Sequence, residues 1–150
     1  MWQRIQTIFL ILASGSCWSL FLKPLGLAGV SGDLASVQST PLADGVLHLL
    51  EQPALIALSA LAGITSLIAV FLYKNRKTQI RVTQLSVVLA FALLIAVLAF
   101  FYVDFKKISA ATYVFQPGLL LPFTSIIAGV LAILNIRKDD KIVRSMDRLR

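Results

Sequence analysis

Four long apolar blocks divide the chain, and none of them contains Asp, Glu, Lys, Arg or His. They cover residues 5–22, 54–73, 85–103 and 118–136. A residue advances about 1.5 Å along an α-helix and the hydrocarbon core of a bilayer is about 30 Å thick, so a spanning helix needs roughly 20 apolar residues. Each block therefore predicts a transmembrane helix.

The first block is the shortest and the least hydrophobic of the four. Four of its residues are small or carry a hydroxyl group: Ser14, Gly15, Ser16 and Ser19. Its start also resembles a cleaved signal peptide, since Arg4 precedes the apolar stretch IQTIFLILA and small residues follow. Because the apolar run resumes with WSLFL beyond those small residues, we expect a helix that is retained.

The composition agrees with a membrane protein. The chain is 58% hydrophobic and 14% charged, whereas soluble domains contain about 45–50% apolar and about 25% charged residues. An ordinary water-soluble domain is therefore excluded. The predicted fold class is an all-α membrane protein. It comprises a four-transmembrane-helix bundle over residues 1–136, with an outer loop over 23–53, and an amphipathic C-terminal tail helix over 137–150.

The basic residues are distributed unevenly between the two sides that four spans define. Three of the fourteen Lys and Arg lie on the side of the outer loops, namely Lys23, Lys106 and Lys107, and the other eleven lie on the side of the termini. Because cytoplasmic loops of membrane proteins carry an excess of Lys and Arg, we expect both termini in the cytoplasm. This topology also accounts for the net charge of +7, so no nucleic-acid partner is expected.

Small residues recur at four-residue spacing inside two of the blocks. The pairs are Ser59 and Gly63, Ala62 and Ser66, Ser125 and Gly129, and Ala128 and Ala132. Small side chains on one helix face allow neighbouring backbones to approach closely in lipid. We predict that these pairs form the packing seams of the second and fourth helices. The short loop between the second and third blocks predicts that those two helices are antiparallel neighbours.

The outer loop mixes turn-forming residues with short apolar runs, and two local structures fit it. Leu42, Val46, Leu49 and Leu50 fall on one side of a helix, whereas VLHLL (46–50) also fits a strand paired with the stretch around LASVQ (34–38). The periodicity of so few residues does not choose between them.

The sequence contains no arrangement of side chains typical of catalysis, cofactor binding or metal binding. No ionisable residue lies inside a predicted span; Asp104 is the nearest, and we expect it to be solvated at the outer interface. His48, the only histidine, lacks the neighbouring ligands of a metal site. Cys17, the only cysteine, predicts a small buried side chain. We therefore expect no enzyme activity, no cofactor and no small-molecule substrate.

Residues 137–150, RKDDKIVRSMDRLR, combine an apolar stripe with charges at helical spacing. The stripe consists of Ile142, Val143, Met146 and Leu149. Asp140 precedes Arg144 by four residues, a spacing at which opposite charges stabilise a helix. Such a tail fits an anchor that sets topology, a helix lying on anionic lipid, or a helix that docks on a partner.

Both ends of the chain resemble one known family. The start MWQRIQTIFLILA, the four spans and the end RKDDKIVRSMDRLR are similar to a bacterial family of small integral membrane proteins known only as a domain of unknown function. The strongest matches are QRIQT (3–7) and VRSMDRLR (143–150), while Trp2 departs from the aliphatic residue typical of that place. The resemblance implies four helices and a bacterial inner membrane, but no reaction and no functional residues.

The two motifs are expected to share the cytoplasmic face of the inner membrane, which suggests a surface that binds another inner-membrane protein. The partner-binding residues predicted there, by recognition and salt bridging, are Arg4, Gln6, Arg144, Asp147, Arg148 and Arg150. The favoured function is a non-catalytic accessory or scaffold subunit of a bacterial inner-membrane assembly, surrounded by membrane lipid. The alternative is a small oligomeric transporter or channel.

Overall fold

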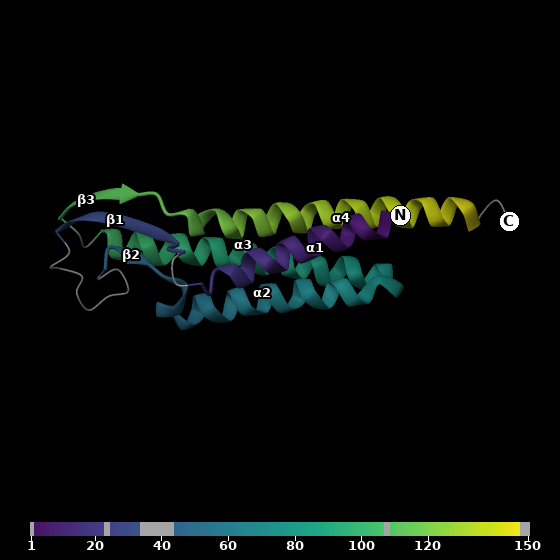
Figure 1. The fold of residues 1–150 in the computed structure, drawn as a ribbon, viewed down its shortest axis with the longest axis horizontal. Helices are drawn as coiled ribbons and strands as arrows, with labels where there is room; N and C mark the ends of the chain where they lie inside the picture. The colour runs from purple at the N-terminus through teal and green to yellow at the C-terminus, as the bar shows by residue number, and fades with distance from the viewer. Residues whose placement is uncertain (1, 23–24, 34–43, 107–108, 148–150) are drawn as a thin grey trace.

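The computed structural model describes residues 2–22, 25–33, 44–106 and 109–147, and within these ranges the side chains of residues 2–4, 32–33, 74, 109–111 and 144–147 are not described. Its α-helices are α1 (Trp2–Ser19), α2 (Pro53–Phe71), α3 (Arg76–Phe105) and α4 (Leu120–Asp147). They lie side by side in one elongated bundle (Figure 1). The prediction of a mostly helical chain is confirmed.

The two ends of the bundle differ in structure. Strands β1 (Ala28–Asp33), β2 (Val46–Leu47) and β3 (Ser109–Val114) lie together at one end, which we call the sheet end. α1 begins and α4 ends at the opposite end, which we call the termini end (Figure 1). The two sequence motifs at the extremes of the chain therefore belong to the same end of the molecule.

Among the described residues, three helices are long and apolar enough to cross a membrane. They are Pro53–Phe71, Arg76–Phe105 and Pro117–Val143. The apolar part of α1, Ile5–Ser19, is shorter. These helices are compatible with a membrane protein, and they correspond to the second, third and fourth apolar blocks.

The helix boundaries follow from local sequence. Pro53 occupies the first turn of α2, where its missing N–H costs nothing. The side chain of Asn75 caps α3 by accepting the backbone N–H of Thr78 at 3.5 Å. A single tight turn over Leu72–Lys74 joins α2 to α3. The two helices pack against each other, as the short loop predicts.

Small residues let α1 pack closely against both α2 and α4. Hydroxyl groups donate hydrogen bonds across these contacts to backbone oxygens: Ser14 to Gly63 at 3.1 Å, Ser59 to Cys17 at 2.9 Å and Ser125 to Ala13 at 3.1 Å. All eight predicted small residues are buried, which agrees with packing seams. Cys17 is also buried, as expected, and its sulfur lies 3.3 Å from the hydroxyl of Ser125.

The sheet was only partly foreseen. Its strand order is β2-β1-β3, and β1 pairs antiparallel with both neighbours. The strand interpretation of residues 46–50 is correct for Val46–Leu47, but the observed partner is Ala28–Gly29. The proposed partner stretch 34–38, and Leu42 of the helical alternative, lie outside the described residues. β3 was not predicted, because its pairing with β1 joins segments that are far apart in the sequence.

A buried cluster at the sheet end connects the sheet to the helices. Leucines of the first connection, including Leu27, Leu47 and Leu49, pack with Leu93 and Val97 of α3. Asp104 also lies at this end and is only 7% exposed, so the expectation of a solvated carboxyl group is wrong. β1 contacts α3, and Tyr113 of β3 packs edge-on against Phe101 of α3 with the ring centroids 5.7 Å apart, so the sheet lies against this end of the helix.

Candidate functional site at the termini end

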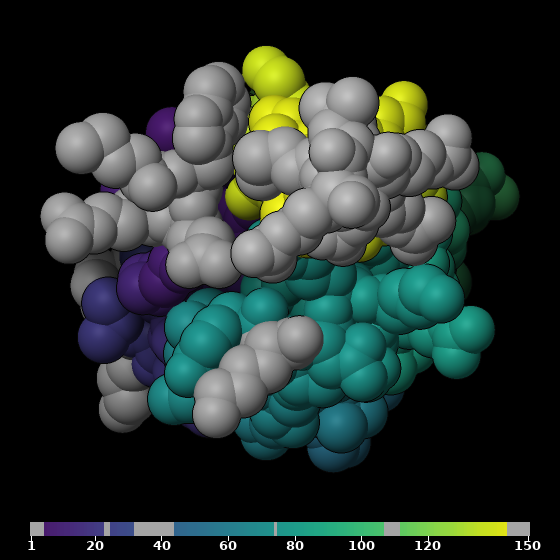
Figure 2. All heavy atoms as spheres, turned by 90° about the vertical axis from the view of Figure 1, so that its right-hand side faces the viewer, coloured from purple at the N-terminus to yellow at the C-terminus, as the bar shows by residue number. Residues whose placement is uncertain are grey.

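The predicted partner-binding residues belong to two helices that meet at the termini end. Arg4 and Gln6 lie on α1, and Arg144 and Asp147 lie on the last turns of α4. The side chains of Arg4, Arg144 and Asp147 are outside the described part, as are Arg148 and Arg150 altogether. Figure 2 looks onto this end, where α1 (purple), the turn between α2 and α3 (teal) and α4 (yellow) come together.

Gln6 and Asp139 tie the two motifs to each other. The amide nitrogen Nε2 of Gln6 donates a hydrogen bond to Oδ2 of Asp139, which is 133 positions away in the chain. Both side chains are 7% exposed. Sequence reasoning named Gln6 but not Asp139, which it treated as one of several tail charges. The side chain of Gln6 thus donates to a residue of the same chain. Its predicted contact with a partner protein stays a prediction.

α4 continues without a break from the apolar block into the tail. Ile136 and Asp139 are buried against the rest of the bundle. One turn later, Ile142 and Val143 are 42% and 37% exposed. The last turns of α4 run past the start of α1 (Figure 1). The tail is therefore a helical extension of a bundle helix, and its described apolar side chains lie outside the core.

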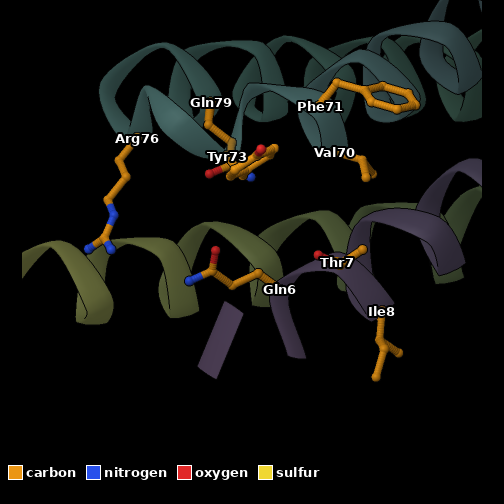
Figure 3. Close-up of a pocket in the computed structure, with 8 residues that line it drawn as sticks. All are labelled: Gln6, Thr7, Ile8, Val70, Phe71, Tyr73, Arg76 and Gln79. Carbon is orange, nitrogen blue, oxygen red and sulfur yellow. The ribbon is translucent and has the colours of Figure 1, made fainter. Parts of the chain in front are cut away.

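A cavity of about 540 Å³ lies beside these contacts, between α1 and the turn that joins α2 to α3. Its polar lining consists of Gln6, Thr7, Tyr73, Arg76 and Gln79. Its apolar lining consists of Ile8, Val70 and Phe71. Figure 3 shows these eight side chains, with Arg76 reaching from the start of α3 towards α4.

Arg76 and Gln79 differ in how their donors are used. Nε2 of Gln79 donates to the backbone oxygen of Ala69 at 3.1 Å, which closes the end of α2 against α3. Nη1 of Arg76 is buried, and among the described residues it has no hydrogen-bond partner. A buried donor without a partner is costly and is a place where a ligand or ordered water is expected. Sequence reasoning did not single out Arg76, because it interpreted the basic residues of that loop only as determinants of topology.

The sheet end offers less chemistry. A smaller cavity of about 280 Å³ there is lined by Asp44, His48 and Glu51 together with leucines. The carboxylate of Glu51 accepts the backbone N–H of His48 at 3.0 Å, so it serves a local turn. In the parts of the chain that the structure covers, no group of three or more His, Cys, Asp or Glu side chains could hold a metal ion.

Comparison with known proteins places the chain in a family. The sequence model of the Domain of unknown function (DUF4293) matches residues 2–149. The chain belongs to the DUF4293 family. No curated protein and no solved structure matches it. The DUF4293 match extends over the start of α1, the cavity and the whole of α4, so every candidate site residue except Arg150 lies in the family region.

Proposed function

We propose that this chain is a non-catalytic accessory or scaffold subunit of a protein assembly in the bacterial inner membrane. Four helices cross the bilayer in this proposal, and the termini end faces the cytoplasm. The long apolar helices support the membrane location. The distribution of basic side chains supports the orientation, because the exposed Arg137, Lys138 and Lys141 lie at the termini end, whereas among the described side chains only Lys106 is basic at the sheet end.

The orientation predicts the behaviour of reporter fusions. A fluorescent protein that matures only in the cytoplasm should be bright when it is fused after Arg150. Alkaline phosphatase, which is active only in the periplasm, should be inactive there and active when it is fused within the outer loop after Glu51. Measuring both reporters at both positions provides the control. The opposite pattern would reject the proposed sidedness.

The docking element in this proposal is the projecting end of α4. Its exposed Ile142 and Val143 form an apolar patch, and the exposed basic residues Arg137, Lys138 and Lys141 precede that patch on the same helix. Asp139 is buried against Gln6, so the outward surface is more positive than the sequence alone indicates. An amphipathic helix of this kind fits an apolar groove bordered by acidic residues on the cytoplasmic side of another membrane protein. The exposed patch on an unbroken α4 is the observation that carries the proposal.

Removing this patch should release the partner. We expect Ile142→Ser with Val143→Ser to lower the amount of each co-purified partner at least tenfold, because apolar contacts at the centre of an interface dominate binding. Native purification in mild detergent followed by quantitative mass spectrometry measures the loss. The matched control is Val114→Ser with Phe115→Ser, which removes two exposed apolar side chains at the sheet end.

Unchanged companions in the tail variant would contradict docking through α4. Purification of the unmodified chain as a closed homo-oligomer without any second protein would instead favour the alternative, a small transporter or channel. A subunit of a mixed assembly requires a different polypeptide at a fixed ratio.

A further inference from the structure

The cavity at the termini end has a polar side and an apolar side. Tyr73, Arg76 and Gln79 lie at or after the end of the apolar span Pro53–Phe71. Val70 and Phe71 lie within that span, and Ile8 lies within the apolar part of α1. In a membrane, the first group is at the level of the headgroups and the second at the level of the upper acyl chains. The cavity therefore crosses the boundary between water and hydrocarbon.

The polar side presents hydrogen-bond donors and a positive charge. Arg76 contributes a buried Nη1 that has no hydrogen-bond partner among the described residues. Thr7 and Tyr73 bring hydroxyl groups to the same lining. A guanidinium group recognises phosphate with two parallel hydrogen bonds and is always charged. The carboxyl group of Asp139 accepts a hydrogen bond from Gln6 and does not line the cavity.

The apolar side opens towards the position of the lipid. Phe71 is 77% exposed, and Ile8 is 61% exposed. These side chains flank the cavity, so an acyl chain beside the bundle could remain attached to a headgroup inside it. The volume of about 540 Å³ is that of an ordinary small-ligand site. It suits a glycerol-phosphate headgroup with the first part of its chains, and it is too small for a whole phospholipid.

We propose that this cavity binds the anionic headgroup of a phospholipid, with Arg76 holding the phosphate and with Ile8, Val70 and Phe71 against the upper acyl chains. Basic pockets between helices on the cytoplasmic side of membrane proteins bind such headgroups. The proposal rests on the membrane embedding described under the proposed function. It adds a specific ligand and a specific site to the proposed accessory subunit.

The test measures lipid binding to the full-length chain in detergent. Native mass spectrometry with titrated phosphatidylglycerol, and with phosphatidylcholine of the same acyl chains, gives the two dissociation constants. We expect tighter binding of phosphatidylglycerol. Arg76→Gln should weaken it at least tenfold. The matched control Arg81→Gln removes a positive charge from an exposed position on the same helix outside the cavity, and it should change the affinity less than twofold.

A second variant tests the cavity without changing its charge. Val70→Trp fills part of the cavity that Val70 and Arg76 both line, and it should weaken phosphatidylglycerol binding as strongly as Arg76→Gln. Circular dichroism and gel filtration identify which variants keep the fold. One folded variant, either Arg76→Gln or Val70→Trp, is enough for the test. Equal losses for Arg76→Gln and Arg81→Gln, or equal affinities for the two lipids, would show general charge attraction and overturn the proposal.

A third arm separates a lipid from free phosphate. Inorganic phosphate at millimolar concentration should leave phosphatidylglycerol binding within twofold of its value, because phosphate gains nothing from the apolar side. Full displacement at that concentration would overturn the assignment to a lipid. All these measurements use the isolated chain. Their failure would leave partner docking through Ile142 and Val143 untouched, and the reverse also holds.

Discussion

Replacing Gly118 with alanine is expected to lower the free energy of unfolding by about 2–4 kcal/mol. A Cβ atom at Gly118 would lie 2.4 Å from the backbone oxygen of Gly26, and backbone cannot move aside as a flexible side chain can. The substitution would also break the hydrogen bond from the Gly118 N–H to that oxygen, which measures 3.0 Å. This contact joins the connection before α4 to the one after α1. Unfolding by sodium dodecyl sulfate in mixed micelles, followed by circular dichroism, measures the change.

Gly15→Ala is the control for this prediction. Nothing lies within 4 Å of the position that its Cβ would take. The added methyl group therefore meets open space on an exposed side of α1, and a helix interior favours alanine over glycine by about 1 kcal/mol in water. We expect no loss of stability. Equal destabilisation by both substitutions would show that the close approach of Gly26 and Gly118 is unimportant.

Separating Gln6 from Asp139 should have the second largest effect. Gln6→Leu leaves a buried carboxyl group without its donor, and Asp139→Leu leaves a buried amide without its acceptor. We expect each to lower the free energy of unfolding by about 1–3 kcal/mol. The double variant should lose less than the sum, because it leaves neither group alone. A double-mutant cycle in the same micelles gives the coupling, which we expect at roughly 0.5–3 kcal/mol.

Asn135→Leu is the comparison for this cycle. Nδ2 of Asn135 donates a hydrogen bond to the backbone oxygen of Leu131 at 2.8 Å. The Asn135→Leu variant therefore also loses a side-chain hydrogen bond on α4. That bond is local to one helix and joins no second element, and its loss should change stability by about 0.5 kcal/mol or less. A coupling near zero between Gln6 and Asp139 would mean that their contact does not hold α1 to α4.

The apolar blocks predicted where hydrocarbon could be crossed, but not how far each helix extends. The third block begins at residue 85, whereas α3 begins at Arg76. The polar turns before the block stay helical because Asn75 caps them and because Gln79, Thr83 and Ser86 are buried against neighbouring helices. Averaging hydropathy over a window of the sequence does not predict helical turns whose buried side chains are polar. The small-residue spacing succeeded because Gly and Ser positions directly mark where backbones approach.

The candidate site was hidden from the sequence for a different reason. QRIQT and the tail were correctly expected to lie at one end, since an even number of helices returns the chain to its starting side. Sharing one end of the bundle is not enough to form the cavity. α1 must also lie beside the turn between α2 and α3, with one particular rotation about its own axis. That rotation comes from contacts such as Ser14 with Gly63, which join residues far apart in the chain. The role of Arg76 follows from this arrangement.

The unbroken course of α4 couples the angular phase of the tail to that of the bundle. Each residue of an α-helix turns the chain by roughly 100°, because a full turn takes about 3.6 residues. One alanine inserted after Asp140 would leave the Gln6–Asp139 contact in place and swing Ile142 and Val143 to a different azimuth. Four inserted residues would return them to within about 40° of their original direction, one turn further out. A protein that binds the end of α4 is therefore held in one fixed orientation relative to the whole bundle.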